Sequence, residues 1–293
     1  MVNKRKSRPL LWLGALFARV WHIRRVVFIA GFYLLMTAWL FSGGSGIDVR
    51  PAEVYSVPDK PLWEKPDSTH WFGTTGHGKD VFYISWVAMA TSLAVAVVCS
   101  GFGLLLALTF VMLFAFDQGL NRFRLVRLMG RTLFIAPPML MLIIVAGGSG
   151  GSLATVMVAL IILIGVQQAP MIASWFEEGE GKFDVVAGYA LGLSRRDIIL
   201  YRDLPKVLRR LVGAFAVMIP WIMLAEMMLS FLGVTGNRIS CGAMISHGQH
   251  LIIEAPWMAV YPGVLASLVV MVFSFLGWRV ASLLRTGEVQ RYW

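Results

Sequence analysis

Glu226 is the only acidic residue inside a predicted membrane span, and Ser230 follows it one helical turn later. An ionised carboxylate is costly in hydrocarbon, so such a residue usually faces a cavity or a partner. Two interpretations of Glu226 stay open. Either it borders a transport pathway and attracts a cationic group, or it is a hydrogen-bonded strut between helices or subunits. Glu226 and Ser230 are therefore our candidate pathway residues.

Two histidines, His247 and His250, stand three residues apart and would share a face if their segment is helical. Imidazole nitrogens are suitable ligands for Ni²⁺ or Zn²⁺, so this pair is our metal-site candidate. His70 and His77 lie in another polar segment. The favoured interpretation is that these four are loop histidines without a common focus, so we expect no resident metal.

Residues 73–80 read GTTGHGKD, which is close to the phosphate-binding loop GxxxxGKS/T. That loop needs a hydroxyl at the last position to hold Mg²⁺, and it must follow a buried strand. Here the last position is Asp80, and residues 66–69 have no strand character. The segment therefore predicts a glycine-rich turn leading into a helix.

Composition identifies the elements that must position these groups. The chain has 293 residues, of which 58% are hydrophobic and only 14% charged, and its mean hydropathy is +0.72. Soluble domains carry about 25% charged residues, and a membrane helix needs about 20 apolar residues. Several runs reach that length, and the short alternating segments of a membrane β-barrel are absent from the sequence. We therefore predict an all-α polytopic membrane protein.

Six apolar runs are predicted to cross the membrane. The third and fourth runs are joined by the glycine-rich turn 147–152 and should form a hairpin. The predicted spans are 26–41, 84–116, 132–147, 153–175, 211–235 and 259–284.

The distribution of basic residues predicts the orientation. With both termini inside, 21 of the 26 Lys and Arg residues fall in cytoplasmic segments, as the positive-inside rule requires. The net charge of +10 is thereby explained by topology, and nucleic acid is not an expected partner. The predicted parts are a basic cytoplasmic N-terminus 1–25, a first helix 26–41, an external loop 42–80, a core 81–284 containing a cytoplasmic hairpin 177–208, and a tail 285–293.

The external loop 42–80 is punctuated by four prolines, so it should be extended rather than helical. Asp80 is the expected N-cap of the second span. Cys99 lies in an apolar run and Cys241 in a loop, so we expect no disulfide between them.

The segment 184–205 is a charged amphipathic hairpin set between two apolar runs. Gly192 fits the left-handed position that ends a helix, and Ser194 with Asp197 forms a capping-box variant for a second short helix. Pro205 is expected to end that helix before the next span. A small apolar face of this kind either docks into the groove of a partner or lies on the membrane surface.

Four motifs in order resemble one family of transporters. Gly192 followed by 204–205 is similar to the "EAA" signature of ABC importer permeases. Other segments resemble the dipeptide/oligopeptide/nickel branch of that family: 70–74 with 78–81 ("HxLGTDxxGRDV"), 225–233 ("AExxLSFLG"), and 255–257 with 262–263 ("APWxxxxPG"). The motifs cover 70–263, and the C-type permease subunit is the best match.

The chain also departs from the family pattern. Val186 stands where the EAA signature has Glu, and Gly188 where it has its second Ala; Asp184 is a candidate substitute for the missing carboxylate. Thr75 and Lys79 replace the Asp of GTD and the Arg of GRD. Cys241 stands where a Trp is usual.

The resemblance implies a non-enzymatic subunit of a type I ABC importer in the cell inner membrane, forming half of a pore for di- or oligopeptides. Implied partners are a homologous B-type permease, two cytoplasmic ATPases that use ATP and Mg²⁺, an extracytoplasmic substrate-binding protein, and membrane lipid; the chain itself binds no cofactor. The alternatives are import of nickel or another small solute, an ion-gradient-driven transporter using Glu226, and a scaffold protein. The residues implied to couple to the ATPases are Asp184, Val186, Ala187, Gly188, Leu191, Gly192, Ser194, Asp197, Leu204 and Pro205.

Overall fold

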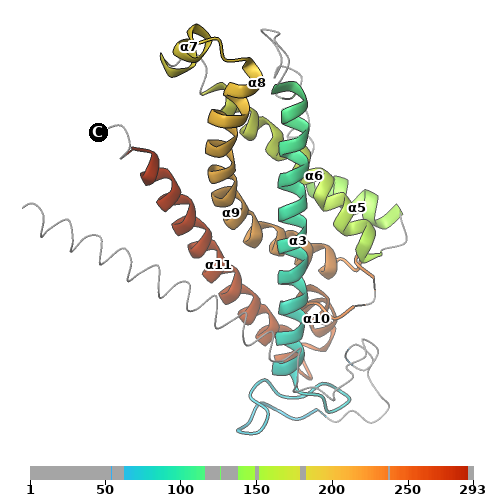
Figure 1. Cartoon of the computed structure of the whole chain (residues 1–293). Coiled ribbons are helices and arrows are strands. Elements are labelled where there is room, and N and C mark those ends of the chain that lie inside the picture. The colour runs from blue at the N-terminus through green and yellow to red at the C-terminus, as the bar shows by residue number, and fades with distance from the viewer. Residues whose placement is uncertain are drawn as a thin grey trace, which may run out of the picture. The chain divides into compact units, whose positions relative to one another are not determined.

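The computed structural model describes Val54, Val126 and residues 63–115, 138–148, 152–178, 183–236 and 238–289. All of them lie in one compact unit, Val49–Trp293. They form helices and turns, with one isolated β-bridge between Thr74 and Asp80 (Figure 1). The predicted all-α class is confirmed. The basic N-terminus 1–25 and the first predicted span 26–41 lie outside the described residues.

Five long or medium helices correspond to the other predicted spans. They are α3 (Val81–Ala115), α5 (Pro138–Gly148), α6 (Leu153–Glu177), α9 (Leu204–Phe231) and α11 (Trp257–Val289). Four stretches are long and apolar enough to cross a bilayer: Val81–Ala115, Leu153–Glu177, Ile198–Phe231 and Trp257–Ser282. The described part of α5 has 11 residues, fewer than a full crossing needs. Helix α11 continues into the segment predicted as a tail.

Helix α9 lies at the centre of the packing. It contacts α3 on one side and α11 on the other, while α6 packs along α3, and α5 packs against α6 as the predicted hairpin requires (Figure 1). The helices approach closely at small residues, as is common between membrane helices. A Cβ added to Gly277 of α11 would lie 2.5 Å from the carbonyl oxygen of Ala216 on α9, so only glycine fits this crossing.

The sequence-based expectation for Pro205 is wrong. The short helix α8 (Arg195–Asp197), the π-helix η1 (Ile198–Asp203) and α9 follow one another without a break, and Pro205 lies in the first turn of α9. Proline lacks an N–H and its ring collides with the carbonyl four residues before it in a regular α-helix. The wider turn provides the alternative geometry, because the Leu204 N–H donates to the carbonyl of Ile199, five residues back. The fifth span therefore starts earlier than predicted and ends at Phe231.

The end of α3 remote from the hairpin is covered by residues 63–80, which contain no helix, as predicted for this part of the external loop. Asp80 caps α3 as expected: its Oδ1 accepts from the backbone N–H of Phe82 at 2.8 Å. The indole N–H of Trp257 donates to the Thr74 carbonyl at 3.1 Å, and Phe72 stacks on Tyr261. These contacts fasten the segment to α11. Residues 73–80 thus form a turn leading into a helix, as the sequence predicted.

Candidate functional site

The first arm of the hairpin is the helix α7 (Phe183–Ala190). It ends at Gly192, which has φ +82°, the left-handed conformation predicted for this position. The Leu193 N–H donates to the Gly188 carbonyl at 3.1 Å, and the Gly192 N–H donates to the Tyr189 carbonyl at 3.0 Å. This pair of bonds defines a Schellman motif, in which glycine avoids the steric cost of a Cβ. The chain therefore reverses sharply at a fixed point.

The second arm begins with the predicted capping box. The Ser194 hydroxyl and backbone N–H both donate to Asp197 Oδ2, at 2.5 and 3.2 Å, and the Asp197 N–H donates back to Ser194 Oγ at 3.3 Å. Reciprocal bonds of this kind satisfy donors that the first helical turn leaves unpaired. Both arms of the hairpin thus have defined ends.

The inner face of the second arm anchors the hairpin to the membrane helices. Ile198 and Ile199 are almost completely buried, and Ile199 joins an apolar cluster with residues of α3, α6 and α9. Deep burial of a branched side chain of this size contributes about 1.5–3 kcal/mol. The hairpin is therefore mounted on the core rather than loosely attached. The cluster comprises Ala107, Leu108, Val111, Ala115, Val126, Ala169, Ile172, Ala173, Phe176, Ile199 and Val207.

The outer face of the hairpin presents large apolar side chains to its surroundings. Leu191 is 82% exposed and Tyr201 is 83% exposed, with Val186, Tyr189 and Leu193 also exposed. We name these five residues the hairpin crest. Exposed large apolar side chains gathered in one element are typical of protein or membrane contact sites. Five described side chains of the hairpin thus point away from the core that Ile199 enters.

The residues that depart from the EAA pattern lie on α7. Val186 is 59% exposed, so the position of the family carboxylate faces outward. A Cβ on Gly188 would meet Ile198 Cδ1 at 3.5 Å, which is ordinary contact, so the structure has room for the family's alanine. Ala187 is half-buried next to them, and Asp184 lies in the first turn, where nothing is described of its side chain. Its suggested role as substitute carboxylate stays a prediction.

Glu226 is completely buried near the other end of α9 and belongs to a polar cluster. Its Oε1 accepts from the Ser230 hydroxyl at 2.7 Å, and Ser230 Oγ lies 2.9 Å from Thr235 Oγ1. The Arg238 guanidinium makes an ion pair with Glu226. The structure thus brings together the two candidate pathway residues, and it adds Thr235 and Arg238.

The sequence interpretation missed Arg238, although a signal for it existed. A carboxylate in a membrane span needs a cationic partner, and Arg238 is the first basic residue after Glu226. The turn at 232–235 reverses the chain so that residue 238 lies against α9 again. Burial and pairing favour the strut over the pathway interpretation of Glu226, because a paired carboxylate is less available to attract a passing cation.

The two candidate metal-binding histidines follow this cluster in the sequence. His247 is in the last turn of α10 (Cys241–Gly248), and His250 is in the short 3₁₀ helix η2 (Gln249–Leu251). Burial, together with the nearby His250, lowers the pKa of His247, which favours the neutral imidazole that binds metals. Among the described residues, however, no group of three or more His, Cys, Asp or Glu side chains could hold an ion. The pair thus lacks further protein ligands of these types there.

Another histidine belongs to the cap of α3. His70 Nδ1 lies 3.1 Å from Asp80 Oδ2, and this hydrogen bond raises the pKa of His70. Asp67 accepts from the hydroxyl of Thr69 and from two backbone N–H groups, which lower the pKa of Asp67 to about 2. These polar groups thus fix residues 63–80 to α3. Elsewhere in the structure, Cys99 and Cys241 are free thiols, as predicted.

Comparison with known proteins agrees with this arrangement. A chain of the MetNI methionine ABC transporter, solved in inward-facing conformations, superposes with a TM-score of 0.54 at 18% identity, covering 70% of this chain and 97% of that one. The two chains share a fold.

The sequence relatives are more specific. The oligopeptide permease protein OppC of Bacillus subtilis is 24% identical over 75% of this chain and 71% of its own length. The dipeptide permease protein DppC of the same organism is 26% identical over 76% and 71%. The glutathione permease protein GsiD of Pectobacterium atrosepticum is 25% identical over 87% and 84%. No family model matches the chain. The predicted resemblance to C-type permeases of peptide importers is confirmed.

Proposed function

We propose that this chain is a permease subunit of an ATP-driven importer for di- or oligopeptides and forms half of its translocation pore. The relatives named for oligopeptide, dipeptide and glutathione transport support the peptide substrate class. The four spanning helices support a multi-pass location in the cell inner membrane. The chain contributes no chemistry of its own, and the energy enters mechanically.

In this proposal a homologous B-type permease completes the pore, and an extracytoplasmic binding protein delivers the peptide. Two cytoplasmic ATPases bind ATP and Mg²⁺ and engage the hairpin 184–205. The orientation predicted from the basic residues, with both termini inside, supports a cytoplasmic hairpin. A motor protein shifts a conformational equilibrium only by binding the two conformations with different affinity. The hairpin crest is the surface through which this differential binding acts.

One observation carries the proposal: an apolar crest stands on a rigidly capped hairpin whose inner face is buried in the helix core. Exposed apolar groups favour a partner's groove, and the fixed mount transfers a displacement of the crest to α9. A membrane-surface hairpin needs the crest but not the rigid attachment.

The test is reconstitution into liposomes of the chain alone, and of the chain with the B-type permease, both ATPases and binding protein. We expect ATP-dependent uptake of a labelled peptide only with the full set. Tyr201→Asp should abolish uptake while assembly in the membrane persists, whereas the matched variant Tyr201→Phe should transport normally. Normal uptake by Tyr201→Asp together with Leu191→Asp would refute the coupling role.

The same liposomes separate the alternatives. Uptake by the chain alone, driven by an ion gradient, would establish a secondary transporter and refute the proposal. ATP-driven uptake of Ni²⁺ without uptake of peptides would retain the architecture and replace the substrate.

A further inference from the structure

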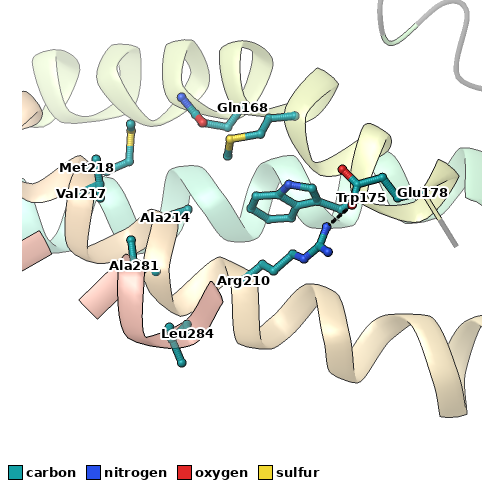
Figure 2. A pocket seen from close by; sticks show the side chains of 11 residues that line it. Gln168, Trp175, Glu178, Arg210, Ala214, Val217, Met218, Ala281 and Leu284 are labelled. Atoms are coloured by element: carbon teal, nitrogen blue, oxygen red, sulfur yellow. Dashed lines mark hydrogen bonds and ion pairs between the residues drawn. The ribbon is translucent and has the colours of Figure 1, made fainter. Parts of the chain in front are cut away.

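A cavity of about 530 Å³ lies between α6, α9 and α11, beside the base of the hairpin (Figure 2). Its volume is within the range of small-molecule sites in proteins. It is lined by residues of all three helices and is separate from both the hairpin crest and the Glu226 cluster. Neither the proposed coupling through the hairpin crest nor the structural role of Glu226 explains why this cavity exists.

One end of the cavity carries two opposite charges. Glu178 Oε2 lies 2.5 Å from Arg210 Nη1, and both side chains line the cavity (Figure 2). The pair keeps access to solvent, with Glu178 55% and Arg210 31% exposed. Glu178 is the C-cap of α6, where the helix dipole disfavours a carboxylate. Helix stability therefore does not explain an acidic residue at this position.

The remaining wall is apolar and adaptable. Trp175 of α6 lines the cavity together with Met218 and Val217 of α9, and Gln168 adds a polar amide (Figure 2). Met171 of α6 is a further lining residue. Methionine side chains are flexible and polarisable, so they accommodate ligands of different shapes. The cavity thus combines two fixed charges of opposite sign with walls that tolerate variable side chains.

We propose that this cavity binds short peptides with free termini, Glu178 receiving the α-ammonium group and Arg210 the α-carboxylate when their ion pair opens. The inference rests on the proposed function and deepens it. Peptides share their charged termini and differ in their side chains, and the cavity matches both properties. Arginine binds a carboxylate through two parallel N–H···O hydrogen bonds. A C-terminal amide has only one oxygen and no charge, so it cannot replace the carboxylate.

The position of the ion pair links this site to the hairpin. Glu178 directly follows α6 on the way into the hairpin, and Arg210 lies on α9 just after it. The pair therefore joins the bases of the two arms. A displacement of the hairpin relative to α6 changes the separation of the two charges, and with it the fit of a peptide.

The experiment uses the full transporter complex in liposomes, without binding protein, so that the selectivity of that protein does not enter. Met218→Cys places a thiol in the cavity for labelling by a maleimide, and Val212→Cys is the matched control on an exposed face of α9. We expect leucyl-leucine to slow labelling of Met218→Cys and to leave Val212→Cys unchanged. The N-acetylated and C-amidated forms should protect at least about tenfold less well, the effect of one charge-assisted hydrogen bond.

Substituting the two charged residues one at a time tests which of them binds which terminus of the peptide. Glu178→Gln should remove the discrimination against the acetylated peptide, and Arg210→Gln that against the amidated one. The exchange Glu178→Arg with Arg210→Glu retains the ion pair, so it should fold and restore both discriminations. Equal protection by all three peptides, protection by none, or protection by phosphatidylglycerol instead would overturn the proposal.

ATP-driven uptake measured with the same complex, after binding protein is added, separates this site from the general function. Uptake of leucyl-leucine without protection of Met218→Cys would refute the site and leave the importer intact. Absence of peptide uptake would refute the proposed function itself.

Discussion

The two ends of α9 differ in which side chains are exposed and which are buried. At the hairpin end, Leu191 and Tyr201 of the crest point outward, and the charged pair Glu178–Arg210 stays accessible. At the other end, Glu226 is buried with Arg238, Ser230 and Thr235. One end leaves apolar surface for a partner, and the other uses polar groups to hold its own segments together. The difference separates an exposed apolar surface, which the proposal assigns to partner binding, from a buried polar cluster that maintains the fold.

The largest expected effect concerns the buried ion pair. Glu226→Met or Arg238→Met alone should lower the free energy of unfolding by about 3–5 kcal/mol, because each leaves the opposite charge buried without its partner. The double variant Glu226→Met with Arg238→Met should lose less than either single variant. Thermal unfolding in detergent, analysed as a double-mutant cycle, measures this. A stable Glu226→Gln variant with impaired uptake would favour the pathway interpretation and break the comparison.

The hairpin itself contains the same contrast between its inner and outer faces. Ile199→Ala should destabilise the protein by about 2–5 kcal/mol, because it empties a packed core position. Leu191→Ala should change stability by no more than about 0.5 kcal/mol, as at an ordinary surface site, and should reduce ATP-coupled uptake. Unfolding temperatures and uptake rates of the two variants test this. Equal losses of stability would show that the crest is part of the fold.

Two glycines in the hairpin test whether its local geometry is fixed. Gly192→Ala should cost about 1–2 kcal/mol, because an L-residue is strained at φ +82°. Gly188→Ala should gain about 0.5–1 kcal/mol, since alanine fits the available space and favours the helix. The rate of limited proteolysis at the hairpin measures both changes. A stabilised Gly192→Ala would contradict the Schellman geometry.

The smallest expected effect is a pH dependence at the other end. Asp80 raises the pKa of His70 above 6.5, so the protonated histidine stabilises the fold fully below 6.5. That contribution is lost as the pH rises through the raised pKa. The stability difference between wild type and His70→Gln should therefore shrink on going from acidic to alkaline solution. A constant difference would show that His70 acts by packing rather than by charge.

Local signals in the sequence were sufficient for much of this structure. The apolar runs predicted α3, α6 and α11 to within a few residues over most of their bounds, because the length of an apolar run is a property of consecutive residues. The caps at Asp80 and Ser194 and the left-handed Gly192 were predicted for the same reason. Each depends on hydrogen bonds that span no more than five residues.

Features that depend on distant residues were not predicted. Glu178 and Arg210 are 32 positions apart, and no local pattern brings them together. Arg238 reaches Glu226 only because the intervening turn folds back onto α9. Pro205 was misinterpreted because the π-helix that accommodates it has no simple sequence signature.

The unbroken helix from Ile198 to Phe231 has a consequence for reach. Its 34 residues are more than the about 20 that one crossing of the hydrocarbon layer needs. The helix is bent, with Pro220 inside α9, so it does not cross the bilayer as one straight segment (Figure 1). In the proposed coupling, a partner that binds Tyr201 in η1 therefore moves a helix that is continuous with the membrane core, without entering the lipid itself.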